Sequence, residues 1–172
     1  MKRKYWCLLF VIIAMPLTAF CQDIKLAELL NYVNLPMKEV SSNVTLKGWE
    51  YKSSLKIEGE GIMWRKYDDS KIESVLSYSK YESSMPSIKE NDKILVFLGT
   101  YSSTYNITFL RDLLGMGFTE DQIQPYENYV EKHYLNKTYH IVVREGKGQY
   151  AYFISTTAGY IIWSLSELAS KG

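Results

Sequence analysis

Lys47-Gly48-Trp49-Glu50-Tyr51 is the stretch that decides how the chain is organised, because a similar stretch returns at Met116-Gly117-Phe118. Each of them follows an apolar stripe with the spacing of one helix face. The two stripes are Met37, Val40 and Val44, and Ile107, Leu110 and Leu114. The stripes lie about 70 positions apart, and the two Gly-aromatic pairs lie about 69 apart. This recurrence predicts an internal duplication.

The residues around the two glycines predict where the helices lie. An apolar stripe at helical spacing covers residues 26–33. Pro36 suits the first turn of a second helix, because proline lacks the N–H that would stay unpaired there. Gly48 suits the left-handed position just past the end of that helix. In the second half, residues 102–104 offer caps for a helix that Gly117 ends.

Strand patterns follow each helical segment. Runs rich in aromatic and β-branched residues, separated by turn residues, are typical of antiparallel strands. These runs are 49–55, 61–67, 72–81 and 94–98 in the first half, and 118–126, 129–135, 138–144 and 150–156 in the second. A last apolar piece, residues 160–165, fits either a strand or a short helix.

The order of these elements predicts an α+β fold. Each half reads as a helix followed by an antiparallel β-meander, with the helices packed on one face of the sheet. After residue 21 we therefore expect one domain, residues 22–172, made of two repeats at about 22–100 and 101–172. About 150 residues can bury a single core of ordinary size.

Residues 1–21 have the three parts of a secretory signal peptide. Lys2-Arg3-Lys4 is a positive start, residues 6–15 are an apolar core, and Ala19-Phe20-Cys21 carries small side chains at a cleavage site. No segment has the roughly 20 apolar residues that a transmembrane helix needs. We expect an exported protein, periplasmic or secreted, with no transmembrane segment after cleavage.

Cys21 raises an alternative, because a cysteine at the end of a signal sequence can carry a lipid anchor. Phe20 argues against lipidation, since lipoprotein processing prefers a small residue there. A lipidated Cys21 would make the protein associated with the outer membrane. Both cysteines of the sequence, Cys7 and Cys21, lie in the signal, so the mature chain has no disulfide framework.

The charge of the mature chain excludes one class of partner. Residues 1–21 hold three of the 20 basic residues and none of the 19 acidic ones, which leaves a small negative net charge. Binding to nucleic acid or to an anionic membrane by bulk electrostatics is therefore not expected. The excess of tyrosine fits half-buried strand faces, or an aromatic platform for a glycan or a protein.

The sequence carries no catalytic motif that we recognise. The mature chain has no thiol, and it lacks a nucleophile elbow, a phosphate-binding loop, a zinc-binding His-Glu-x-x-His helix and an EF-hand loop. We expect a protein that is not an enzyme and has no cofactor.

His133, His140 and Glu131 are the one constellation worth weighing as a site. If a hairpin turns at residues 136–137, His133 lies directly opposite His140, and both point away from the apolar face, near Glu131. Two imidazoles and a carboxylate on one face are a possible zinc site with an open position. A solvated polar face explains the same residues without a metal, and we expect no metal.

The layout resembles the tandem helix-plus-β-meander of β-lactamase inhibitory protein and related small envelope-assembly lipoproteins. The resemblance covers most of the mature chain and rests on the order of elements and the two Gly-aromatic pairs. It implies an inhibitor or immunity-type protein. The chain is also similar to exported proteins of unknown function in Gram-negative bacteria. Neither resemblance assigns a role to a residue.

These observations favour a non-enzymatic exported interaction module. Its partner is expected to be another envelope or secreted protein, bound through exposed Tyr and Trp side chains on an open sheet face. One alternative is a small-ligand carrier or enzyme with a cavity in a curved sheet, lined by Trp64, Tyr78, Phe97 and Tyr152. Another is a structural envelope component anchored by lipid at Cys21.

Overall fold

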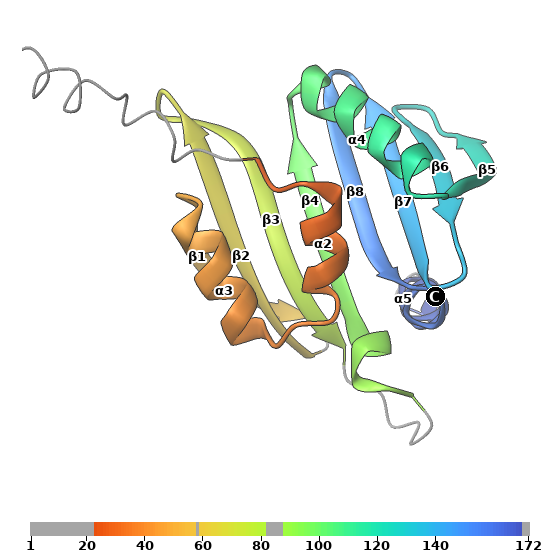
Figure 1. The fold of residues 1–172 in the computed structure, drawn as a ribbon, viewed down its shortest axis with the longest axis horizontal. Coiled ribbons are helices and arrows are strands. Elements are labelled where there is room, and N and C mark those ends of the chain that lie inside the picture. The colour runs from red at the N-terminus through yellow and green to blue at the C-terminus, as the bar shows by residue number, and fades with distance from the viewer. Residues whose placement is uncertain (1–22, 58, 82–87, 170–172) are drawn as a thin grey trace, which may run out of the picture.

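The computed structural model describes residues 23–57, 59–81 and 88–169 of the 172-residue chain. Within them lie four α-helices and one eight-stranded antiparallel sheet, whose strands follow the order β1-β2-β3-β4-β8-β7-β6-β5 (Figure 1). The predicted α+β class is confirmed. The predicted signal peptide, residues 1–21 with Cys21, lies outside the described residues.

Each half of the chain forms one meander of four strands. The first half contains α2 (Leu26–Tyr32), α3 (Met37–Leu46), β1 (Glu50–Ile57), β2 (Gly59–Asp68), β3 (Lys71–Tyr81), the short 3-10 helix η2 (Glu90–Lys93) and β4 (Ile94–Thr100). The second half contains α4 (Ser103–Gly115), β5 (Thr119–Pro125), β6 (Val130–Leu135), β7 (Tyr139–Gly146), β8 (Gln149–Thr156) and α5 (Thr157–Ala169). The meanders join where β4 pairs antiparallel with β8, at the centre of the sheet.

The core lies between the sheet and the helices α2, α3 and α4, which lie in front of the strands in Figure 1. Burial of apolar side chains in this layer is the main stabilising term of the fold. Trp64, Leu76 and Tyr152 point into it from three strands and are completely buried. The predicted apolar stripe of the first helical segment is confirmed, because Leu26 and Leu29 are also buried there.

The two glycines that follow the helices have the expected conformation. Gly48 has φ 80° and Gly117 has φ 77°, which is the left-handed region that favours glycine. The aromatic residue after each of them turns back into the core, since Trp49 and Phe118 are each 3% exposed.

Further matches between the two halves occur at the same offset of 69 positions. Val40 and Val44 are buried on the inner side of α3. Phe109 and Leu113, the residues 69 positions later, are buried on the inner side of α4. Each edge strand also has an irregularity that begins two residues after the buried aromatic residue preceding the strand. The register of β1 on β2 shifts between Tyr51 and Ser53, and that of β5 on β6 shifts between Glu120 and Gln122.

The apolar stripe predicted for the helix of the second half, at Ile107, Leu110 and Leu114, is wrong by one position. Ile107 and Leu114 are 69% and 64% exposed, and Phe109 faces the sheet instead. Its ring lies 4.0 Å from the ring of Tyr152, and the buried Asn106 accepts a hydrogen bond from the Tyr152 hydroxyl at 2.9 Å. Because the polar residue Asn106 lies on the inner side of α4, the spacing of apolar residues did not identify the buried face of this helix.

The prediction that all helices pack on one face of the sheet is also wrong. Residues 160–165 belong to the helix α5, which lies on the opposite face from α2, α3 and α4. Its Tyr160 stacks on His140 with ring centroids 3.6 Å apart, and its Trp163 stacks on Phe153 at 5.3 Å. His140 and Phe153 alternate along their strands with the core residues, so α5 covers side chains that the other helices cannot reach. None of the described helices is long and apolar enough to cross a membrane.

Candidate binding groove and buried histidine chain

One row of residues crosses the sheet on the face that carries α5. Strand pairing places Arg65 beside Val75, Val75 beside Gly99, Gly99 beside Ala151 and Ala151 beside Arg144. The three central members are small, whereas an arginine stands at each end. The row therefore has a low floor over β3, β4 and β8 and two raised, charged sides.

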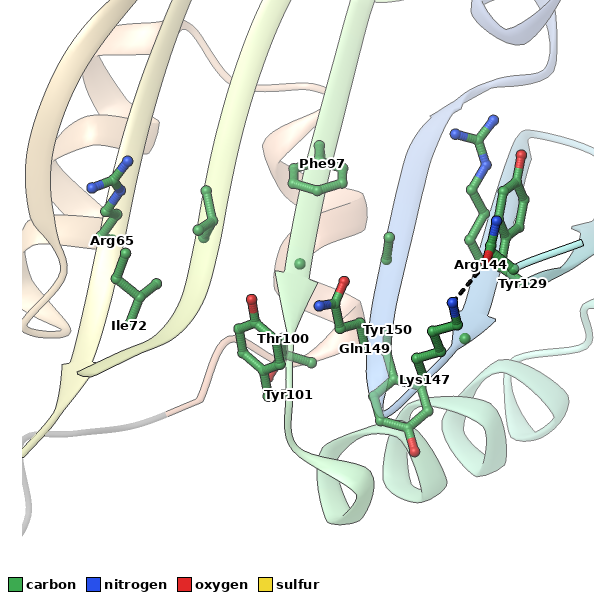
Figure 2. A pocket seen from close by; sticks show the side chains of 15 residues that line it. Arg65, Ile72, Phe97, Thr100, Tyr101, Tyr129, Arg144, Lys147, Gln149 and Tyr150 are labelled. Atoms are coloured by element: carbon green, nitrogen blue, oxygen red, sulfur yellow. Dashed lines mark hydrogen bonds between the residues drawn. The ribbon is translucent and has the colours of Figure 1, made fainter.

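A groove of about 550 Å³ follows this row beyond the part of the face that α5 covers (Figure 2). Arg65 and Ile72 stand on one side of it, and Arg144 and Lys147 stand on the other, as Figure 2 shows. The residues that line it are Arg65, Ile72, Val75, Phe97, Gly99, Thr100, Tyr101, Asn128, Tyr129, Arg144, Gly146, Lys147, Gln149, Tyr150 and Ala151. A volume of this size is in the range of ligand sites in proteins.

Gly146 allows the second side of the groove to form. A Cβ atom at this position would collide with the carbonyl oxygen of Asn128 and would lie 2.8 Å from the Cβ of Tyr129. The turn between β5 and β6 can therefore pack directly on β7 only because residue 146 is glycine. Lys147 then donates a hydrogen bond to the Asn128 Oδ1 at 2.7 Å, which ties this turn to the β7–β8 turn.

The groove is positively charged. Its lining includes Arg65, Arg144 and Lys147 and no acidic residue. Glu131 balances one of these charges, because its Oε2 accepts a hydrogen bond of 2.6 Å from the Arg144 Nε. The Arg65 Nε is buried without a hydrogen-bond partner among the described residues. Electrostatic complementarity therefore favours an anionic ligand here.

Glu131, His133 and His140 form a hydrogen-bonded chain next to the groove. The Glu131 Oε1 lies 3.0 Å from the His133 Nε2, and the His133 Nδ1 lies 3.0 Å from the His140 Nε2. When Glu131 accepts from the His133 Nε2, the His133 Nδ1 is left to accept from the His140 Nε2. Every one of these bonds is then satisfied with two neutral imidazoles.

The structure brings the three predicted site residues together in a different register. His133 pairs with Val142 and His140 pairs with Leu135, so the two histidines are diagonal neighbours and not direct partners. The Asn136 side chain accepts bonds from two backbone N–H groups of the turn, which makes the turn longer than predicted.

The expectation of a solvated polar face at these residues is wrong. Glu131, His133 and His140 are 6%, 4% and 7% exposed, because Tyr160 of α5 and the Arg144 side chain cover them. Within the described part of the chain, no three or more His, Cys, Asp or Glu side chains are grouped as a metal site would need. His133 is the middle member of the hydrogen-bonded series, and its two ring nitrogens are used for Glu131 and His140.

The pKa of His140 is lowered to about 4, mainly by burial and also by the neighbouring His133, while Asp121 opposes the shift. Between pH 6.5 and 4 the unfolded chain binds a proton at His140 that the folded chain does not, so stability is lost as the pH falls through this range. Because of His140, we expect the free energy of unfolding to decrease by about 2 to 3 kcal/mol as the pH falls through this range. Urea unfolding measured from pH 4 to 8 checks this.

A His140→Gln variant is the control for this prediction. Glutamine can still donate a hydrogen bond to His133 but does not titrate, so the variant should lose stability less steeply over the same range. Parallel pH profiles of the two proteins would contradict the assignment to His140.

The four aromatic residues predicted to line a cavity lie on both faces of the sheet, and only Phe97 borders the groove. Trp64, Tyr78 and Tyr152 belong to the core, and Phe97 points to the opposite face, so these four residues do not line one cavity. Exposed tryptophans on the open face were also predicted, but Trp49 and Trp64 are buried. Tyrosines take their place, namely Tyr101, Tyr129 and Tyr150.

The arginine pair and the small residues between the two arginines could not be recognised from the sequence. Arg65 and Arg144 belong to different halves of the chain, and only the strand order places them on one row. The signal present in the sequence was a small residue in each of two strongly apolar strands, Gly99 and Ala151. No family model, curated protein or solved structure matches the chain.

Proposed function

We propose that this protein is a non-enzymatic exported binding module, and that the groove on the open sheet face receives a segment of a partner protein. The observation that carries the proposal is the row from Arg65 to Arg144, with its low floor and charged sides. Exposed tyrosine and arginine side chains are the residue types that dominate protein interfaces. Tyr101, which follows the central strand β4 and lines the groove, is 59% exposed.

A rigid framework supports the groove. The ring of Tyr126 stacks on that of Tyr129 at 4.7 Å, and the Arg144 guanidinium lies 5.4 Å from the Tyr129 ring and 4.7 Å from the Phe153 ring. Side chains held in this way lose little freedom when a ligand binds, which favours affinity. The partner is expected to be another envelope or secreted protein, in agreement with the signal peptide expected at residues 1–21.

Two alternatives to this proposal differ from it, one in the molecule that would fill the groove and the other in how the protein would be anchored. A small-ligand carrier could use the same groove, since its volume of about 550 Å³ would accommodate a small molecule. A lipid-anchored envelope component would begin at a modified Cys21, which intact mass measurement of the mature protein would reveal.

The fold is further proposed to have arisen by duplication. The support is the offset of 69 positions, which relates Gly48 to Gly117, Trp49 to Phe118 and the irregularity after Tyr51 to the one after Glu120. The two halves differ at their outer ends, because α2 precedes the matched helix only in the first half and α5 follows the last strand only in the second.

Chemical footprinting of the tyrosines tests the binding proposal. The full chain, carrying a C-terminal affinity tag, is first used to recover its partner from an envelope extract of its own source. Hydroxyl-radical labelling is then measured with and without that partner. Tyr101 in the groove and Tyr51 on edge strand β1 are similarly exposed, at 59% and 55%. We expect the partner to protect Tyr101 at least severalfold more than Tyr51.

Equal protection of both tyrosines, or protection of Tyr51 alone, would contradict the placement of the partner in the groove. Recovery of no partner at all would favour the small-ligand carrier.

A further inference from the structure

The two arginines at the ends of the row line opposite sides of the same groove. Arg144 uses its Nε for Glu131, and neither of its Nη groups has a hydrogen-bond partner among the described residues. Arg65 lines the opposite side, and its buried Nε is unpartnered. Arginine presents a planar fork of N–H groups that matches a carboxylate, so each end of the groove is suited to one such group.

The strand order fixes how far apart these two positions are. Arg65 lies on β2 and Arg144 on β7, with β3, β4 and β8 between them. At the usual spacing of about 4.8 Å between strands, their backbones are about 19 Å apart along the row. An extended peptide rises about 3.3 Å per residue, so about five or six residues cover this distance.

The floor between the arginines has room for a peptide backbone and small or flat side chains. Gly99 has no side chain, the Phe97 ring lies against the position that its Cβ would take, and its neighbours in the row are Val75 and Ala151. The rings of Tyr101 and Tyr150 and the Gln149 amide border this floor and can contact a peptide lying on it.

We propose that the groove binds an extended acidic segment of the partner, with one carboxylate at Arg65 and a second, about six residues away and therefore on the same side of the extended segment, at Arg144. This inference rests on the proposed function and specifies the chemistry of the partner at the same site. Lys147 strengthens the field at the Arg144 end, where its one described hydrogen bond is to the neutral Asn128 side chain. A single phosphate would engage only one end of the row.

Fluorescence anisotropy with labelled peptides tests this proposal. The probes are Gly/Ser/Tyr peptides that carry two glutamates four, six or eight positions apart, and the same peptides with glutamine in place of glutamate. We expect the pair six positions apart to bind about tenfold or more tighter than its glutamine analogue, as for one or two charge-assisted hydrogen bonds. The difference should shrink as salt is raised.

Arg65→Gln should remove most of the preference for glutamate, whereas Lys38→Gln, which neutralises an exposed lysine of α3, should leave it unchanged. Arg65 is chosen because Arg144 donates a hydrogen bond to Glu131. A change at Arg144 would therefore also disturb the buried hydrogen bonds of Glu131 and the two histidines.

Three results would overturn the proposal. They are equal binding of glutamate and glutamine peptides, absence of binding by every peptide at millimolar concentration, and competition by inorganic phosphate as strong as by the diglutamate peptide. If any of these occurs while the partner still protects Tyr101, the groove remains the binding site and only the acidic-segment inference fails.

Discussion

Replacing Trp49 or Phe118 by alanine is expected to lower the free energy of unfolding by about 3 to 5 kcal/mol in each case. Both side chains are 3% exposed and both belong to the same core cluster. Removing either ring loses the free energy of burial and leaves a cavity that the surrounding sheet and helix can fill only in part. If the two residues are equivalent anchors of two repeats, the two losses should be similar. Urea unfolding of each variant measures them.

Trp49→Phe is the matched control, because it gives the first half the residue that the second half has. The Trp49 Nε1 is buried without a hydrogen-bond partner among the described residues, so the change also removes an unpaired polar group. We expect a loss of less than about 1.5 kcal/mol for this variant. A near-neutral effect of Trp49→Ala or Phe118→Ala would contradict the role of both residues as core anchors.

The succession of elements could be predicted from local features. Turn residues and β-branched runs indicated the eight strands, and Gly48 and Gly117 marked two helix ends because a positive φ has a clear residue preference. The inner face of α4 was not predictable from apolar spacing. Asn106 faces inward because it bonds to Tyr152 and Glu145, which are distant in sequence.

Neither the helical state of α5 nor the face of the sheet that it covers could be predicted from the periodicity of its apolar residues. Residues 160–165 are apolar at most positions, and such a short run fits a strand as well as a helix. The face that it covers is decided by His140 and Phe153, which offer rings for Tyr160 and Trp163 to stack on. The sequence also indicated that Glu131, His133 and His140 share a face, but their burial depends on Tyr160 of α5 and on the Arg144 side chain.

The groove was beyond sequence reasoning, because it lies across the junction of the two meanders. Gly99 and Ala151 become neighbours only when β4 pairs with β8. Local sequence signals predict hairpins between consecutive strands, whereas this pairing joins strands about 50 residues apart. Arg65 and Arg144 line one groove only because of this junction.

Ala151→Phe is expected to weaken binding of the recovered partner about 100-fold, which corresponds to about 2.7 kcal/mol. Ala151 lies in the floor of the groove, between Gly99 and Arg144 on its row. A phenyl ring there would occupy the space above Gly99, which has no side chain of its own. The change adds an apolar group at a half-buried position of β8 and leaves the core on the opposite face untouched.

The matched control is Thr45→Phe, which adds the same ring at an exposed position of α3, on the other side of the sheet. Thermal unfolding of both variants shows whether the fold is kept. Titration calorimetry of the partner with the wild-type chain and the two variants then tests most directly whether the groove is the binding site. We expect Thr45→Phe to bind like the wild type and Ala151→Phe to lose about two orders of magnitude in affinity; wild-type affinity in a folded Ala151→Phe protein would contradict the account.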